Sequence, residues 1–241
     1  MNRLIRAVTL LVLSLPGATT MAQGLDDSRQ LIVVTSKNWD DIQGIAQRYE
    51  RHGDSFEKFE PPFAVVLGKN GMGWGKGLDN PGQQQGPVKQ EGDGKAPAGI
   101  FKLGTAFGYD AKADTRLPYL ELTPNIECVD DGPNARYNQL VDSAVIVKDW
   151  NSAEQMRRKD DLYRQGIFIE HNTPASPAAG SCIFFHIWRG PTTPTRGCTA
   201  MAPADIARLL SWLDPRQSPR LVQLPEAQYE QLRERWQLPE R

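Results

Sequence analysis

Residues 183–201 read IFFHIWRGPTTPTRGCTAM, and this stretch governs both the fold and the chemistry expected of the chain. It opens on an apolar run typical of a buried strand. His186 lies on that run, a loop rich in proline and threonine follows, and the chain returns with Cys198 directly after Gly197. A thiol needs a base to become a nucleophile at neutral pH, and imidazole has a suitable pKa. We therefore expect Cys198 as nucleophile and His186 as general base and acid, with backbone N–H groups beside Gly197 forming an oxyanion hole.

The remaining pattern predicts a mainly β fold with a few helices. Short β-branched or apolar runs separated by turn signals outnumber the segments with helical spacing, which is typical of an antiparallel β-sandwich or open barrel. Strands are expected at 30–35, 63–67, 143–147, 166–170 and 183–187, and helices at 41–51, 151–163 and 203–213, with a short helix within 221–236.

The first 22 residues resemble a cleavable secretory signal. Arg3 and Arg6 precede an apolar core, and small residues favour cleavage after Ala22. The rival interpretation is a membrane anchor, but the apolar run is shorter than the ~20 residues that a helical span needs. The sequence thus predicts secretion to the periplasm. The net charge of the 241-residue chain is −1 and its basic residues are scattered, so no nucleic-acid partner is expected.

The cysteine count is odd. In an oxidising compartment, three cysteines indicate one disulfide and one free thiol. We assign the disulfide to Cys128 and Cys182 and leave Cys198 free. The rival hypothesis is that Cys182 acts as a resolving thiol for Cys198, because strand alternation puts Cys182 on the same face as His186.

The His…Thr-x-Gly-Cys arrangement resembles the active-site signature of the L,D-transpeptidase (YkuD-type) catalytic domain of peptidoglycan enzymes. The resemblance extends over a domain at about 30–219, with 220–241 as a C-terminal tail packed on it, and it implies that family's β-sandwich or open barrel. The other matching segments are EGDG at 91–94, APAGIF at 96–101, DWNSAEQM at 149–156, EHN at 170–172 and GS at 180–181.

This resemblance implies a periplasmic cysteine L,D-transpeptidase that acts on peptidoglycan stem peptides in cell-wall biogenesis and cell shape. Cys198 would form a thioester, a terminal D-amino acid would leave, and an amine acceptor, which could be a wall-attached protein, would take the acyl group. The alternative is a peptidoglycan L,D-carboxypeptidase or other hydrolase that uses the same cysteine. The resemblance also implies a carbapenem target, and neither a cofactor nor a metal is required.

Four further residues are expected to bind substrate. Arg196 stands where many family members have histidine; it cannot act as a base, and it would either bind a substrate carboxylate or face solvent. Trp150 and Glu154 would line the cleft, or Glu154 would close a helix capping box. His171 would orient the site or satisfy a buried hydrogen bond.

Other classes of function stay open at this point. The chain could be a non-catalytic wall-binding domain, or it could hold zinc through His171, His186 and Cys198, although the spacing matches no familiar zinc pattern. A papain-like protease is disfavoured because its nucleophile precedes its histidine. The interval between His186 and Cys198 is shorter than in many family members, and Ala200 replaces the usual arginine. These departures leave the choice between cross-linking and hydrolysis open.

Overall fold

The computed structural model describes residues 24–78 and 85–241. The predicted signal segment at 1–22 therefore lies outside the described residues. Among the helices that are described, none is both long enough and apolar enough to cross a membrane.

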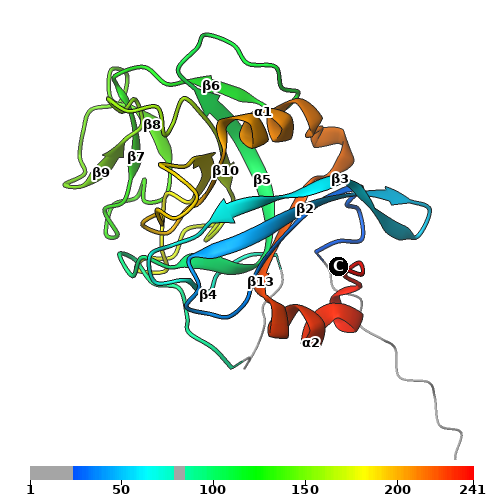
Figure 1. Cartoon of the computed structure of the whole chain (residues 1–241). Coiled ribbons are helices and arrows are strands. Elements are labelled where there is room, and N and C mark those ends of the chain that lie inside the picture. The colour runs from blue at the N-terminus through cyan, green and yellow to red at the C-terminus, as the bar shows by residue number, and fades with distance from the viewer. Residues whose placement is uncertain (1–23, 79–84) are drawn as a thin grey trace, which may run out of the picture.

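The chain forms a closed eight-stranded barrel (Figure 1). The strands follow the order β10-β11-β12-β3-β2-β1-β13-β5, and β10 pairs with β5 to close the ring. The prediction of a mainly β fold is confirmed, and the barrel is closed rather than open. The eight strands are β1 (Gln30–Ser36), β2 (Gln43–His52), β3 (Ser55–Val66), β5 (Ala96–Gly108), β10 (Gln165–Ile169), β11 (Phe184–Ile187), β12 (Thr199–Met201) and β13 (Arg220–Pro225).

Short strands extend the barrel and build a lobe beside it. β4 (Met72–Trp74) and β6 (Tyr119–Glu121) each pair in parallel with β5. A separate three-stranded sheet, with β7 (Ile126–Val129) between β8 (Leu140–Asp142) and β9 (Ala153–Gln155), stands at the left in Figure 1. This lobe supplies one wall of the cleft described below.

The segment at 41–51, expected as a helix, is strand β2. Every residue of β1 is buried, so both of its edges need hydrogen-bonding partners. β2 supplies one edge and β13 the other. The apolar residues of 41–51 have helical spacing, and in the strand they are not all buried: Ala46 and Tyr49 are buried, but Ile45 is exposed. Tertiary pairing therefore overrides the local pattern here.

Two other expected elements are also wrong. Residues 143–147 form a turn rather than a strand, and Val145 and Val147 are exposed there. The helix expected over 151–163 is replaced by β9 and turns. The backbone and side-chain amides of Asn151 both donate to Asp131 Oδ2, at 2.8 and 3.1 Å, so Asn151 does not cap a helix.

Two α-helices cover opposite ends of the barrel (Figure 1). α1 (Pro203–Trp212) confirms the helix expected after the cysteine, with Pro203 at its first turn and Ile206 and Leu209 buried. A 3₁₀ turn at Pro215–Gln217 leads into β13. α2 (Glu226–Trp236) follows and buries Trp236. Residues 220–241 thus contribute a barrel strand as well as a helix packed on the core.

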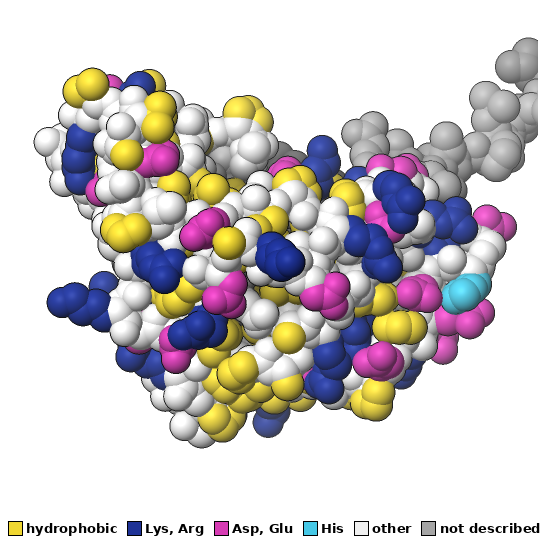
Figure 2. Space-filling view, turned by 90° about the horizontal axis from the view of Figure 1, so that it is seen from above, with side chains coloured by type: hydrophobic (Ala, Val, Ile, Leu, Met, Phe, Trp, Pro, Cys, Tyr) yellow, Lys and Arg dark blue, Asp and Glu magenta, His cyan; other side chains and the backbone are white. Residues whose placement is uncertain are grey.

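The face of the molecule that is seen from above carries both signs of charge. Figure 2 shows Lys and Arg side chains interspersed with Asp and Glu on this face, without a field of one sign.

Candidate active site

The adjacent parallel strands β11 and β12 bring the predicted nucleophile and base to one cleft. His186 pairs with Ala200, and Cys198 lies two residues before Ala200. His186 thus lies on β11, and Cys198 lies directly before β12. Both line a cleft of about 810 Å³, a volume typical of ligand sites in proteins.

Cys198 is a buried free thiol. Its sulfur accepts a hydrogen bond from Phe184 N–H at 3.4 Å and lies 3.5 Å from Cys182 O, to which the thiol can donate. Burial, and after it the nearby carboxylate of Glu154, raises the pKa of Cys198 to about 12. The Phe184 N–H and the cations Lys89 and Arg158 act in the opposite direction. The resting thiol is therefore protonated and needs a base before it can attack.

His186 is suited to that role because its ring is neutral. Its Nδ1 lies 2.8 Å from the carbonyl oxygen of Ile187. A carbonyl can only accept, so Nδ1 carries the proton and Nε2 is the free base. Burial lowers the pKa of His186 to about 4. The edge of Tyr163 packs against the ring, with centroids 5.2 Å apart, and holds its orientation.

Gly197 has a φ of +148°, a backbone conformation that L side chains rarely adopt. A Cβ at this position would meet Lys95 O at 3.1 Å and Lys89 Nζ at 3.9 Å. The N–H of Gly197 donates to Thr195 Oγ1 at 3.1 Å, and that hydroxyl donates to Cys198 O at 2.6 Å. The oxyanion-hole role of Gly197 stays a prediction, and it requires this N–H to be released or shared when a substrate arrives.

Charged side chains of both signs surround the thiol. Glu154, expected at the substrate cleft, lines it, and so does the exposed Arg196. Glu154 accepts a 2.6 Å hydrogen bond from Tyr163 and lies 3.6 Å from Arg158. Burial raises the pKa of Glu154, although the Tyr163 hydroxyl and Arg158 oppose that shift. On the same wall, Asp130 Oδ1 is buried and has no hydrogen-bond partner among the described residues.

Trp150 and His171 lie outside the lining of the cleft. Trp150 is buried in the lobe and donates from Nε1 to Glu127 Oε2 at 2.7 Å. Nδ1 of His171 accepts the N–H of Lys76 at 3.2 Å, and its Nε2 lies 2.9 Å from Ala179 O. These contacts place both side chains in the frame behind the cleft, and His171 lies near the side chain of Lys89.

Sequence reasoning missed three residues that surround the thiol: Lys89, Arg158 and Tyr163. The sequence predicts Arg158 and Tyr163 on a helix that does not form. It therefore does not predict the contacts of these two side chains with Glu154. Lys89 stands two residues before the EGDG segment at 91–94, and its proximity to that motif was the available signal.

The structure joins Cys128 to Cys182 by a disulfide across 54 residues of sequence. Cys128 lies on β7 and Cys182 lies just before β11, so the bridge ties the lobe to the strand that carries His186. Cys182 also lines the cleft. In this state Cys182 is not available as a thiol partner for Cys198.

Replacing both bridged cysteines, as Cys128→Ser with Cys182→Ser, should lower the free energy of unfolding by about 2–5 kcal/mol, because the unfolded chain regains the freedom that the bridge removes. Guanidinium unfolding followed by fluorescence measures the change. Cys198→Ser is the matched control, since it removes a thiol without breaking a bridge and should shift the midpoint far less. A double variant as stable as the parent protein would contradict the expectation.

Among the described residues, no group of three or more His, Cys, Asp or Glu side chains is placed to hold a metal ion. In particular, His171 is engaged with Lys76 and Ala179 behind the cleft that His186 and Cys198 line. The three residues considered for zinc are thus not brought together.

No family model and no curated protein matches the chain. Two solved structures resemble it at low similarity, and both are crystal structures of the helical cell shape determining protein Pgp2 from Campylobacter jejuni. One is 13% identical with a TM-score of 0.41 and covers 85% of this chain and 51% of that one. The other, a K307A mutant, is 14% identical with a TM-score of 0.40 and covers 84% and 50%. This chain spans about half the length of those proteins.

Proposed function

We propose that the protein is a periplasmic cysteine acyltransferase, an L,D-transpeptidase that acts on peptidoglycan stem peptides. The observation that carries this proposal is that a buried thiol, just before β12, and a neutral imidazole, on the neighbouring parallel strand β11, line the same cleft. The sequence resemblance supplies the substrate class, and the geometry supplies the two groups that the reaction needs.

The first half-reaction forms a thioester. Nε2 of His186 takes the proton of the Cys198 thiol as the sulfur attacks the carbonyl carbon of the third residue of the stem. The tetrahedral intermediate collapses when the bond to the fourth residue breaks. The imidazolium of His186 returns its proton to the departing amine, so a D-amino acid leaves and Cys198 holds the acyl group.

The second half-reaction releases the acyl group. The amine of a second stem, or of a wall-attached protein, attacks the thioester while His186 accepts its proton. The C–S bond then breaks, and the proton returns to the sulfur to regenerate the thiol. When water takes the place of the amine, the same steps give hydrolysis and a shortened stem.

The charges in the cleft suit a substrate that carries both signs. Arg158, Arg189 and Arg196 line the cleft and can pair with carboxylates. Glu154 and the unpaired Oδ1 of Asp130 offer acceptors to an ammonium group. Peptide ends with free amino and carboxyl groups fit this arrangement better than neutral or purely anionic ligands do.

Mass spectrometry of purified tetrapeptide muropeptides incubated with the protein tests the proposal. The expected products are cross-linked dimers and free D-amino acid. Shortened monomers without dimers would assign the hydrolase instead, and unchanged muropeptides that still bind the protein would indicate a wall-binding domain. Cys198→Ala is the control, since binding would survive in this variant while any turnover would stop.

A further inference from the structure

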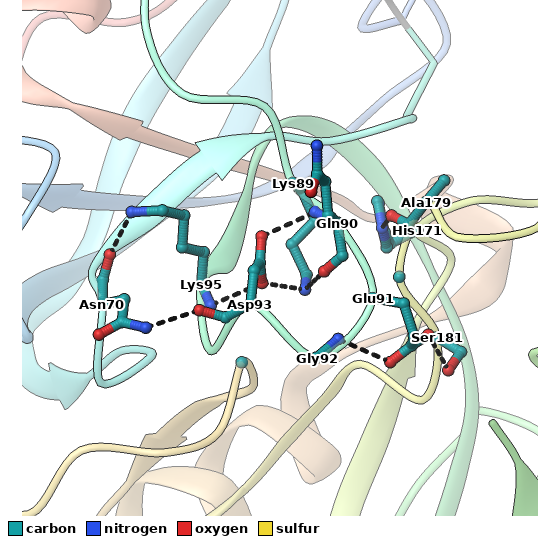
Figure 3. Close-up of polar contacts among 12 residues, drawn as sticks. Asn70, Lys89, Gln90, Glu91, Gly92, Asp93, Lys95, His171, Ala179 and Ser181 are labelled. Atoms are coloured by element: carbon teal, nitrogen blue, oxygen red, sulfur yellow. Dashed lines mark hydrogen bonds and ion pairs between the residues drawn. The ribbon is translucent and has the colours of Figure 1, made fainter.

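A lysine ammonium is buried beside the nucleophile. Lys89 lies in the loop between β4 and β5, and its side chain is only 3% exposed. Nζ donates to Gln90 O and to Asp93 Oδ1, each at 2.6 Å (Figure 3). Burying a lysine costs several kcal/mol unless it is paired, so a chain seldom places one inside without a reason.

Asp93 holds the loop in shape as well as pairing with the lysine. Its carboxylate accepts the backbone N–H groups of Gln90 at 2.7 Å and Lys95 at 2.9 Å (Figure 3). The negative charge of Asp93 is therefore shared among three donors. The Lys89 ammonium, with two acceptors among the described residues, can still serve a third, because it has three hydrogens.

The Lys89 ammonium lies beside Gly197, the residue that directly precedes the nucleophile, and faces the cleft. A Cβ built on Gly197 would lie 3.9 Å from Lys89 Nζ, and Lys89 lines the same cleft as Cys198. A Cβ on Gly180 would come within 3.0 Å of Lys89 Cε. Both neighbours of the lysine are glycines with positive φ, so the backbone approaches the side chain where a Cβ would crowd it.

The thiol needs such a cation because its surroundings disfavour charge. Burial favours the neutral forms of both Cys198 and His186, so transfer of the proton between them creates two buried charges. Arg158 is the other cation that favours the thiolate, but its side chain is 29% exposed and it is bonded to Asp160. Lys89 is also paired with a carboxylate, Asp93, so the two cations differ in their exposure to solvent. Solvent weakens the field of Arg158 at the sulfur, and the buried Lys89 is the less screened charge of the two.

We propose that Lys89 is the buried cation that stabilises negative charge at this site, first on the sulfur of Cys198 and then on the carbonyl oxygen of the attacked acyl group. Lys89 acts only by donating hydrogen bonds, so it changes neither the atoms nor the protons transferred by His186. The role at the sulfur follows from the structure alone. The role at the carbonyl oxygen rests on the proposed acyl transfer.

Alkylation of Cys198 by iodoacetamide between pH 7 and 9 tests the role at the sulfur without any peptide. In this range the rate follows the fraction of thiolate. Lys89→Met should slow alkylation by roughly tenfold, which corresponds to about one pKa unit. Lys95→Met is the matched control: it removes the same charge from the same loop, where the ammonium instead binds Asn70 O at 2.6 Å (Figure 3). Its rate should stay within about twofold of the parent protein.

A second variant separates charge from folding. Lys89→Met leaves Asp93 without its ionic partner, whereas Lys89→Met with Asp93→Asn removes the whole pair and should recover thermal stability. Alkylation should remain slow in the double variant if the lysine charge acts on the thiol. The proposal is overturned if either variant alkylates at the parental rate, because the lysine would then serve only to hold the loop. Failure of peptide turnover would leave this result unaffected, so the two proposals can fail separately.

Discussion

Cys198→Ala should lose acyl transfer by at least about 10⁴-fold, because no other group in the cleft can form the thioester. The same variant should show no mass increase after exposure to a carbapenem, whereas the parent protein should gain one covalent adduct per chain. Intact-protein mass spectrometry and the release of D-amino acid from a stem tetrapeptide measure the two effects. Circular dichroism should remain parental, since the change removes only one buried sulfur.

The variant that combines Cys128→Ser with Cys182→Ser is the informative control for this adduct. It keeps Cys198 as its single cysteine, so it should still be acylated at a temperature where it is folded. An adduct that persists in Cys198→Ala would move the acylated residue elsewhere and remove the basis for the proposed enzyme.

His186→Gln should reduce kcat/KM by about 10²- to 10⁴-fold while leaving the thiol in place. The pH profile gives a second readout. The base must be unprotonated, and the pKa of His186 is lowered to about 4 by burial, so activity should hold from neutral pH down to about pH 5 and fall as pH approaches 4. We call this fall in activity toward pH 4 the acid limb, and the residual activity of His186→Gln should lack it.

His171→Gln is the matched comparison, because His171 is also buried with its pKa lowered to about 4 but lies outside the cleft. This variant should retain the acid limb even if its stability falls. If both variants lose the limb, or neither does, the acid dependence does not arise from His186, and the assignment of the general base is wrong.

The sequence predicts some of the strands with a continuous apolar pattern, and it predicts the histidine on one of them and the cysteine after the following loop. Strand β11 is an apolar run that is buried, whereas the apolar run at 143–147 forms a turn with Val145 and Val147 exposed. The segment at 41–51 misleads because its apolar residues have helical spacing, and only the need to cover the edge of β1 makes it a strand.

The charges around the thiol are harder to foresee. Lys89 reaches the cleft because Asp93 accepts the backbone N–H groups of Gln90 and Lys95 and so fixes the shape of the loop. The path of that loop depends on hydrogen bonds that residue types alone do not specify. Glu154 on β9 and Arg158 in the irregular segment after it likewise approach the thiol through backbone that replaces an expected helix. Sequence patterns predict burial and the periodicity of helices and strands. The electrostatic field at a reactive atom depends on the path of irregular backbone, which these patterns do not predict.

The position of β13 has a consequence for how the protein is made. This strand lies between β1 and β5, yet it follows all the other described strands in sequence. During synthesis on the ribosome, β1 therefore emerges long before β13, its neighbour in the barrel. Pairing residues so distant in sequence is entropically slow, so the barrel cannot close until β13 has been synthesised, and one edge of β1 stays unpaired in the interval.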